Sequence, residues 1–140
     1  MKYLNFVSKA IASLLIISAI SCNLAYAKQT DKVVLHINNP LKMTMLVNNV
    51  KNLRKMLDKD AIITIVVNGP AVARFSTTFS SRKQLDEILQ QNAAVNICSF
   101  ALKNKKISKE QLFKGVNYLE DGGVFKLVEL QQQGFAYLKP

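Results

Sequence analysis

Residues 61–68, AIITIVVN, form an almost unbroken run of apolar and mostly β-branched side chains. A strand with one face in water alternates apolar and polar residues, whereas a strand covered on both faces reads as a continuous apolar run. Gly69 and Pro70 follow directly and end the run. The segment therefore predicts a central strand of a parallel sheet that carries helices on both faces.

The residues before this run predict a strand and then a helix. Residues 32–38, KVVLHIN, are short and rich in branched apolar side chains, which is typical of a strand. Asn39 and Pro40 then suit the N-cap and the first position of a helix. Across residues 42–58 apolar side chains recur at steps of three and four residues, which indicates an amphipathic helix with one buried stripe.

The residues after the run repeat the same alternation. Ser81 and Gln84 form a candidate capping box for a helix that extends to residue 91, and a strand over residues 94–100 follows. Residues 101–108 are then expected to carry the chain outward, and Ser108 with Gln111 can cap a short helix. A strand at 116–120, a helix at 124–133 and a strand at 135–139 complete the series. We expect a three-layer α/β/α domain with a mostly parallel sheet of about five strands.

The N-terminus has the layout of a secretory signal peptide. Lys2 and Lys9 precede an apolar run at residues 10–20, and the small-residue site AYA ends at Ala27. Cleavage there leaves residues 28–140 as a single domain that is periplasmic or secreted and has no membrane span. The alternative is a lipid-anchored form, because ISC at residues 20–22 resembles a poor lipoprotein box with Cys22 as the lipidated residue.

The exported part of the chain is basic. It keeps 17 of the 19 Lys and Arg residues and all 9 acidic residues, which gives a net charge of +8. This balance favours acidic partners, anionic lipid or nucleic acid. However, the basic residues cluster only in residues 102–109, LKNKKISK, and no nucleic-acid-binding motif accompanies them. We therefore interpret the charge as a solvated basic surface and expect no specific nucleic acid partner.

Cysteine use narrows the chemistry further. Once Cys22 is removed with the signal peptide, Cys98 is the only thiol, so no intramolecular disulfide can form. One thiol and one imidazole, that of His36, cannot complete a zinc site, and we predict no metal and no cofactor. No P-loop, GxGxxG, GxSxG or HExxH motif is present. A Cys–His hydrolase would need Cys98, His36 and an orienting group such as Asn68.

Several polar and small residues fall where the predicted strands end. In an open parallel sheet, ligands bind beyond the carboxyl ends of the strands. The candidates at these positions are His36, Asn68, Gly69, Cys98, Gly122 and Gly123. Each also has a structural explanation: the cysteine as a small core residue, the histidine as a partner of the backbone, and the glycines as turn residues. We predict Cys98 as the reactive group and the other five as substrate- or anion-binding residues.

The order of several short segments resembles the DsrE family, in particular its small exported members. The segments are VVLHINNP at residues 33–40, ITIVVNGPAV at 63–72, NICSFAL at 96–102 and LVELQQQGFAYLKP at 127–140. The resemblance implies a compact α/β domain that forms a trimer or hexamer. It also implies a sulfur relay, in which the family cysteine, here Cys98, accepts sulfur from a donor protein as a persulfide and hands it to an acceptor. Ser99 departs from the pattern, because a glycine commonly follows this cysteine.

Two other functions compete with the relay. One is a non-catalytic, oligomeric binding or assembly module with a basic face, and the other is a binder of small anions or ligands at the strand ends. Persulfide transfer requires a thiolate, which nearby cations or a helix N-terminus favour. Lys103, Lys105 and Lys106 follow Cys98 closely and are candidates for that positive potential. The relay requires a modifiable thiol, whereas neither binding function does.

Overall fold

The computed structural model of the protein describes residues 30–80 and 82–140. The predicted signal peptide at residues 1–27, the alternative anchor Cys22 and the predicted cap residue Ser81 lie outside the described residues. Within the described part of the chain, no helix is long and apolar enough to cross a membrane.

A five-stranded sheet with entirely parallel pairing forms the centre of the molecule, as predicted. Its spatial order is β4-β3-β2-β1-β5, so the apolar segment that includes β2 lies in the middle. The strands are β1 (Lys32–Ile37), β2 (Ile62–Val67), β3 (Ala94–Cys98), β4 (Asn117–Leu119) and β5 (Ala136–Leu138). The last strand of the sequence therefore pairs with the first one.

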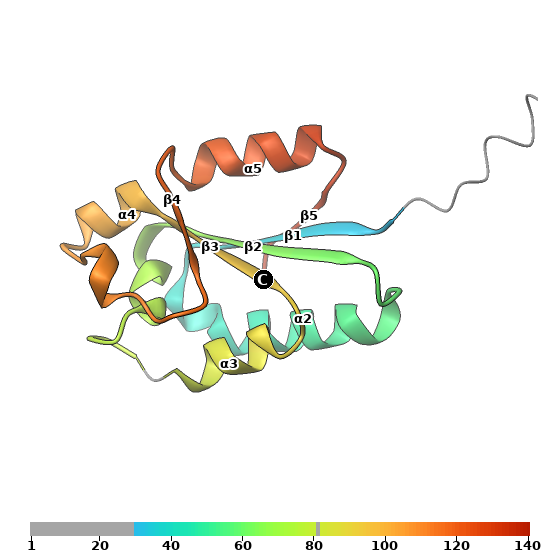
Figure 1. Ribbon diagram of the computed structural model, residues 1–140, viewed down its shortest axis with the longest axis horizontal. Helices are drawn as coiled ribbons and strands as arrows, with labels where there is room; N and C mark the ends of the chain where they lie inside the picture. The colour runs from blue at the N-terminus through green and yellow to red at the C-terminus, as the bar shows by residue number, and fades with distance from the viewer. Residues whose placement is uncertain (1–29, 81) are drawn as a thin grey trace, which may run out of the picture.

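Helices cover both faces of this sheet and make the three layers visible in Figure 1. The longer helix α2 (Met43–Met56) and the helix α3 (Lys83–Leu89) pack on one face, and α5 (Gly123–Gln132) crosses the other. Short helices fill the connections at the carboxyl ends of the strands. They are η2 (Pro40–Lys42), η3 (Gly69–Phe75), α4 (Ser99–Asn104) and η4 (Lys109–Gln111).

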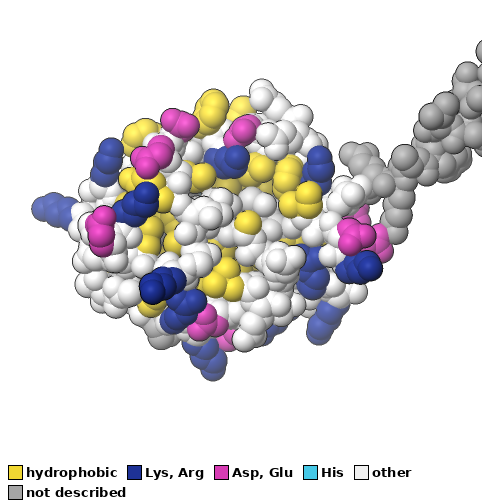
Figure 2. All heavy atoms as spheres, viewed as in Figure 1, with side chains coloured by type: hydrophobic (Ala, Val, Ile, Leu, Met, Phe, Trp, Pro, Cys, Tyr) yellow, Lys and Arg dark blue, Asp and Glu magenta, His cyan; other side chains and the backbone are white. Residues whose placement is uncertain are grey.

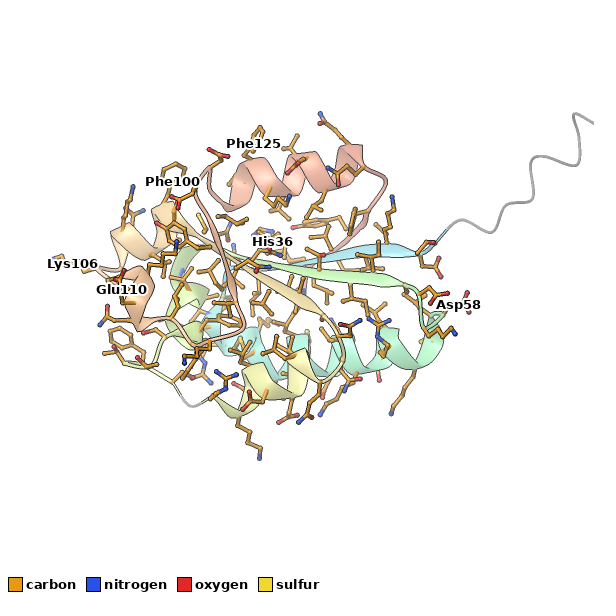
Figure 3. The ribbon with its side chains drawn as sticks, viewed as in Figure 1. His36, Asp58, Phe100, Lys106, Glu110 and Phe125 are labelled. Carbon is orange, nitrogen blue, oxygen red and sulfur yellow. The ribbon has the colours of Figure 1, made fainter. Side chains whose placement is uncertain are left out.

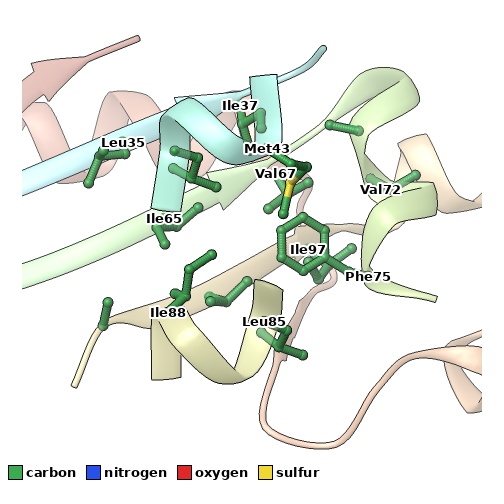
Figure 4. Packing of buried hydrophobic residues seen from close by; sticks show 14 of the residues in the cluster. Leu35, Ile37, Met43, Ile65, Val67, Val72, Phe75, Leu85, Ile88 and Ile97 are labelled. Carbon is green, nitrogen blue, oxygen red and sulfur yellow. The ribbon is translucent and has the colours of Figure 1, made fainter. Parts of the chain in front are cut away.

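Two apolar clusters hold these layers together. The larger one lies between the sheet and the α2–α3 layer, where the fully buried ring of Phe75 packs among side chains from α2, α3 and the strands (Figure 4). The smaller one joins α5 to the opposite face of the sheet through Val34, Val66, Leu127 and Leu130. Burial of this apolar surface is the main contribution that stabilises the fold.

Side-chain caps fix two of the connections as the sequence predicts. The Asn39 side chain accepts a hydrogen bond from Leu41 N at 3.0 Å, ahead of the proline that starts η2. Farther along, Ser108 N donates to Gln111 Oε1 at 2.8 Å in a capping box around η4. Both caps satisfy backbone groups that would otherwise have no partner at a helix start.

The segment after the third strand differs from the sequence prediction. The strand was expected to run to residue 100 and the chain then to lead outward, but β3 ends at Cys98 and α4 begins at Ser99. Ala101 and Leu102 are both buried on this helix, which packs against η3. A short apolar run has the same composition in a strand and in a buried helix, so periodicity alone does not separate the two.

Candidate functional site

A pocket of about 450 Å³ opens at the carboxyl edge of the sheet, where β2 and β3 end and α5 begins. Five of the six residues predicted from the strand ends line it: Asn68, Gly69, Cys98, Gly122 and Gly123. They come from three separate segments of the chain. Because all strands are parallel, their carboxyl ends meet at this edge, and the fold brings the five residues together.

Cys98 is the last residue of β3 and also the N-cap of α4. It follows the register pair Val67–Ile97 by one residue, which places it beside Asn68 at the end of β2. The residue is only 5% exposed and borders the pocket. It is the one cysteine among the residues that the structure describes, and its thiol is free.

The two adjacent glycines let the start of α5 lie directly against this cysteine. A Cβ atom built on Gly123 would lie 3.2 Å from Cys98 Cβ and 3.2 Å from Val66 Cγ1. Gly122, the N-cap of α5, has φ +83° and ψ 164°, a conformation that is essentially restricted to glycine. The positive end of the α5 dipole is therefore close to the Cys98 thiol.

Gly69 is a glycine for a different structural reason, which is its backbone conformation. Its φ of +53° turns the chain between β2 and η3, and a Cβ there would meet only the backbone and Cβ of Asn38 at 3.5 and 3.6 Å. Its left-handed conformation explains the glycine as a turn residue. The same turn brings Gly69 and Pro70 to the wall of the pocket.

His36, the sixth predicted residue, is not among the pocket-lining residues and reaches them only through Asn68. Its Nε2 atom lies 2.9 Å from Asn68 Oδ1, and its Nδ1 atom lies 2.7 Å from the hydroxyl of Tyr137. His36 is the second-last residue of β1, in register with Val66, and in Figure 3 it lies apart from the labelled Phe100 and Phe125. Tyr137 was not predicted from the sequence, because its proximity depends on the pairing of β5 with β1.

Helix α4 adds two pocket residues that were not predicted from the sequence, Phe100 and Asn104. Lys105, which follows this helix, also lines the pocket. Of the three lysines predicted to supply positive potential, Lys105 borders the pocket, while Lys103 Nζ lies 5.8 Å from the centre of the Phe100 ring. The missed signal is the helical periodicity of residues 99–104, hidden by the apolar strand before them.

Ser99 holds the opposite side of the site in place. Its buried hydroxyl donates to the carbonyl of Glu120 at 2.9 Å, which ties the start of α4 to the loop before Gly122. The serine is not among the residues that line the pocket. The departure from the DsrE pattern at this position therefore adds a tether between two segments of the site and leaves the pocket lining unchanged.

The charged side chains and the possible metal ligands of the protein are spread over the molecule. On the face seen in Figure 2, Lys and Arg side chains are spread around the edge of the molecule and alternate with acidic ones. No group of three or more His, Cys, Asp or Glu residues able to hold a metal ion occurs within residues 30–80 and 82–140. Unlike a metal site, the pocket beside Cys98 is lined by a thiol, by amide side chains and by the N-terminus of a helix.

Comparison with known proteins establishes the fold of the chain. No protein-family model matches the sequence, and no curated protein is significantly similar to it. Among solved structures, MTH1491, a protein of unknown function from Methanobacterium thermoautotrophicum, matches with a TM-score of 0.71 and 26% identity, covering 79% of this chain and 99% of its own.

Two further solved structures share this architecture at lower identity. BT1422, a conserved protein of unknown function from Bacteroides thetaiotaomicron, has a TM-score of 0.61 and 18% identity, with coverage of 79% of this chain and 95% of its own. YchN from E. coli has a TM-score of 0.61 and 14% identity, with coverage of 79% and 100%. The chain thus has the α/β fold of MTH1491, BT1422 and YchN over nearly their whole length.

Proposed function

We propose that the protein is an exported, DsrE-like sulfur carrier in which Cys98 holds the transferred sulfur as a persulfide. The observation that supports this function best is the position of Cys98, at the border of a pocket formed by the strand ends and the start of α5. The sequence resemblance to the DsrE family supports the same function, and the α/β fold shared with MTH1491 agrees with the fold that this resemblance implies.

The proposed transfer uses only the thiol and a sulfane-sulfur donor. The Cys98 thiolate attacks the outer sulfur of the donor, the donor's sulfur–sulfur bond breaks, and the leaving group departs with the electron pair. An acceptor thiolate then attacks the terminal sulfur of the persulfide and regenerates the Cys98 thiolate. Within residues 30–80 and 82–140 no other cysteine is present to resolve the persulfide, so the sulfur passes to another molecule.

The electrostatics of the pocket suit the anionic forms of this cycle. The N-terminus of the ten-residue helix α5 lies against Cys98, and one basic residue, Lys105, and one acidic residue, Asp121, border the same pocket. A helix N-terminus and a nearby cation both favour negative charge on a thiolate or a persulfide. The proposal therefore assigns two groups of the chain to charge stabilisation and Cys98 to the covalent step.

Sulfur loading of Cys98 is the direct test. We expect the exported form, residues 28–140, to gain the mass of one sulfur atom after incubation with thiosulfate or a protein persulfide, and to lose it on treatment with a reducing thiol. Intact-mass spectrometry measures both steps. The variant Cys98→Ser should gain nothing, and a wild-type chain that stays unmodified with both donors would rule out the carrier function.

Self-association is a second proposal, and it rests on an exposed apolar patch. The patch consists of Phe100 on α4 and of Val124, Phe125 and Val128 on α5. Their exposed fractions are 55% for Phe100, 69% for Val124, 61% for Phe125 and 47% for Val128. Phe100 and Phe125 lie at the same end of the molecule, and hydrophobic surface is visible along the α5 side (Figures 2 and 3). Several exposed apolar side chains on one side of a molecule commonly mark an interface.

We propose that a second copy of this chain covers the patch. The neighbouring Lys126 and Glu129 form an ion pair at 2.8 Å, so the border of the patch carries both signs of charge and is suited to contact with an identical surface. We expect Phe125→Asp to lower the average mass measured by light scattering, because it would bury a carboxylate in the contact. The matched control is Phe79→Asp, at a 58% exposed position outside the patch. A wild-type chain that stays monomeric at all concentrations would contradict the proposal.

A further inference from the structure

Three side chains form a continuous hydrogen-bonded chain from the edge strand β5 to the wall of the pocket. The Tyr137 hydroxyl lies 2.7 Å from His36 Nδ1, and His36 Nε2 lies 2.9 Å from Asn68 Oδ1. The two rings are also in contact, with centroids 5.8 Å apart. Tyr137 and His36 are about a hundred residues apart in sequence, so only the fold brings them together.

The chemistry of the acceptors fixes the direction of both hydrogen bonds. The amide oxygen of Asn68 can only accept, so His36 Nε2 must carry the proton that it donates. In the neutral imidazole, Nδ1 is then an acceptor, and the Tyr137 hydroxyl donates to it. The order of donation therefore runs from Tyr137 to His36 to Asn68.

The same bonds set the orientation of the Asn68 amide. The backbone of Asn68 is held by the hydrogen bond from its N to Ile37 O at 3.0 Å, and its Oδ1 atom faces His36. Asn68 lines the pocket beside Cys98, whereas His36 does not. With the oxygen bound to the histidine, the NH2 group is the polar end of the Asn68 side chain that is left to serve the pocket, which Asn68 lines.

We propose that Tyr137 and His36 are positioning residues, which hold Asn68 so that its NH2 group donates to the sulfur that Cys98 receives. This inference rests on the proposed sulfur-carrier function. When the Cys98 thiolate attacks the outer sulfur of thiosulfate, the sulfur–sulfur bond breaks and sulfite leaves with the electron pair. The negative charge of the product then lies on the terminal sulfur of the persulfide, where an amide N–H is a suitable partner.

The first measurement is the protonation pattern of His36 by NMR. His36 is the only histidine in the sequence, so in tag-free protein the imidazole nitrogen signals need no assignment. We expect the neutral wild-type ring to carry its proton on Nε2. Tyr137→Phe removes the donor to Nδ1 and keeps the ring, so we expect it to shift the population toward the Nδ1–H form. A wild-type ring with its proton on Nδ1 would overturn the proposed orientation.

The second measurement compares two reagents for Cys98, because a merely structural change would alter both rates. The rate of sulfur loading from thiosulfate, divided by the rate of alkylation by iodoacetamide, should fall roughly fivefold in Tyr137→Phe, the effect of one hydrogen bond. In Asn68→Ala the NH2 group is lost without a new charge near Cys98, and there the ratio should fall by at least about tenfold. Tyr118→Phe, at a tyrosine outside this pocket, is the matched control and should behave as wild type.

The outcomes separate this inference from the function on which it rests. A wild-type chain that loads sulfur while Tyr137→Phe and Asn68→Ala load it with an unchanged ratio would overturn the positioning role alone. If the rates of sulfur loading and of alkylation fall together and their ratio does not change, the three residues have only a structural role. A wild-type chain that takes up no sulfur from any donor would overturn the carrier function itself, and the positioning role with it.

Discussion

Replacement of Phe75 by alanine should lower the free energy of unfolding by about 3–5 kcal/mol, the usual cost of truncating a fully buried phenylalanine. The ring is 0% exposed and packs at the centre of the larger cluster, among Met43, Val67 and Ile97 (Figure 4). The loss combines the transfer energy of the ring with the cavity that remains, because the strands around it cannot move inward far enough to fill the space.

Urea denaturation of the variant and the wild type measures this difference. Phe79→Ala is the matched control, because that ring lies only four residues away and is 58% exposed; it should change the stability by no more than about 0.5 kcal/mol. Equal losses in the two variants would contradict the packing described here. Because η3 ends at Phe75 and begins at the pocket residue Gly69, we also expect Phe75→Ala to speed the labelling of Cys98 by loosening the pocket wall.

The layers of the fold follow from hydrophobic periodicity. The continuous apolar run at residues 61–68 predicts a strand covered on both faces, and the structure places its core, β2, in the middle of the sheet. The amphipathic stripe of α2 and the glycine after α5 similarly predict where these helices lie and end. Sequence patterns of this kind are local, so they define elements and leave open the order of the strands.

The site was predictable to the extent that it depends on parallel strand ends. Cys98, Asn68 and the glycine pair follow strands or precede a helix in sequence, and parallel pairing alone brings them to one edge. The contact between His36 and Tyr137 was not predictable, because it requires β5 to pair with β1, and nothing in the local pattern of a three-residue edge strand specifies its neighbour. Phe100 and Asn104 were missed for a similar reason, since their place at the pocket depends on the short helix α4.

Gly122→Ala should have the other large effect, a loss of about 2–5 kcal/mol in the free energy of unfolding, because it combines backbone strain with overpacking. At φ +83° and ψ 164° the backbone is in a region that an alanine avoids, and the new Cβ would lie 2.6 Å from the Phe100 ring. The clash requires the Phe100 ring to shift, and relief of the backbone strain requires the start of α5 to move, where it lies against Cys98. We therefore expect sulfur loading of Cys98 to fall along with the stability.

Two comparisons separate the causes of this loss. Gly134 has a similar φ of +84° but no atom within 4 Å of its Cβ position, so Gly134→Ala should cost only the strain, about 1–2 kcal/mol, and should leave sulfur loading unchanged. In the double variant Gly122→Ala, Phe100→Ala the clash is removed and the backbone strain remains, so its extra loss over Phe100→Ala alone should be smaller than the loss in Gly122→Ala, and the difference measures the clash. If Gly122→Ala is instead no more destabilising than Gly134→Ala, then Gly122 is not in close contact with the Phe100 ring. The start of α5 beside the Cys98 pocket would then not require a glycine for lack of space.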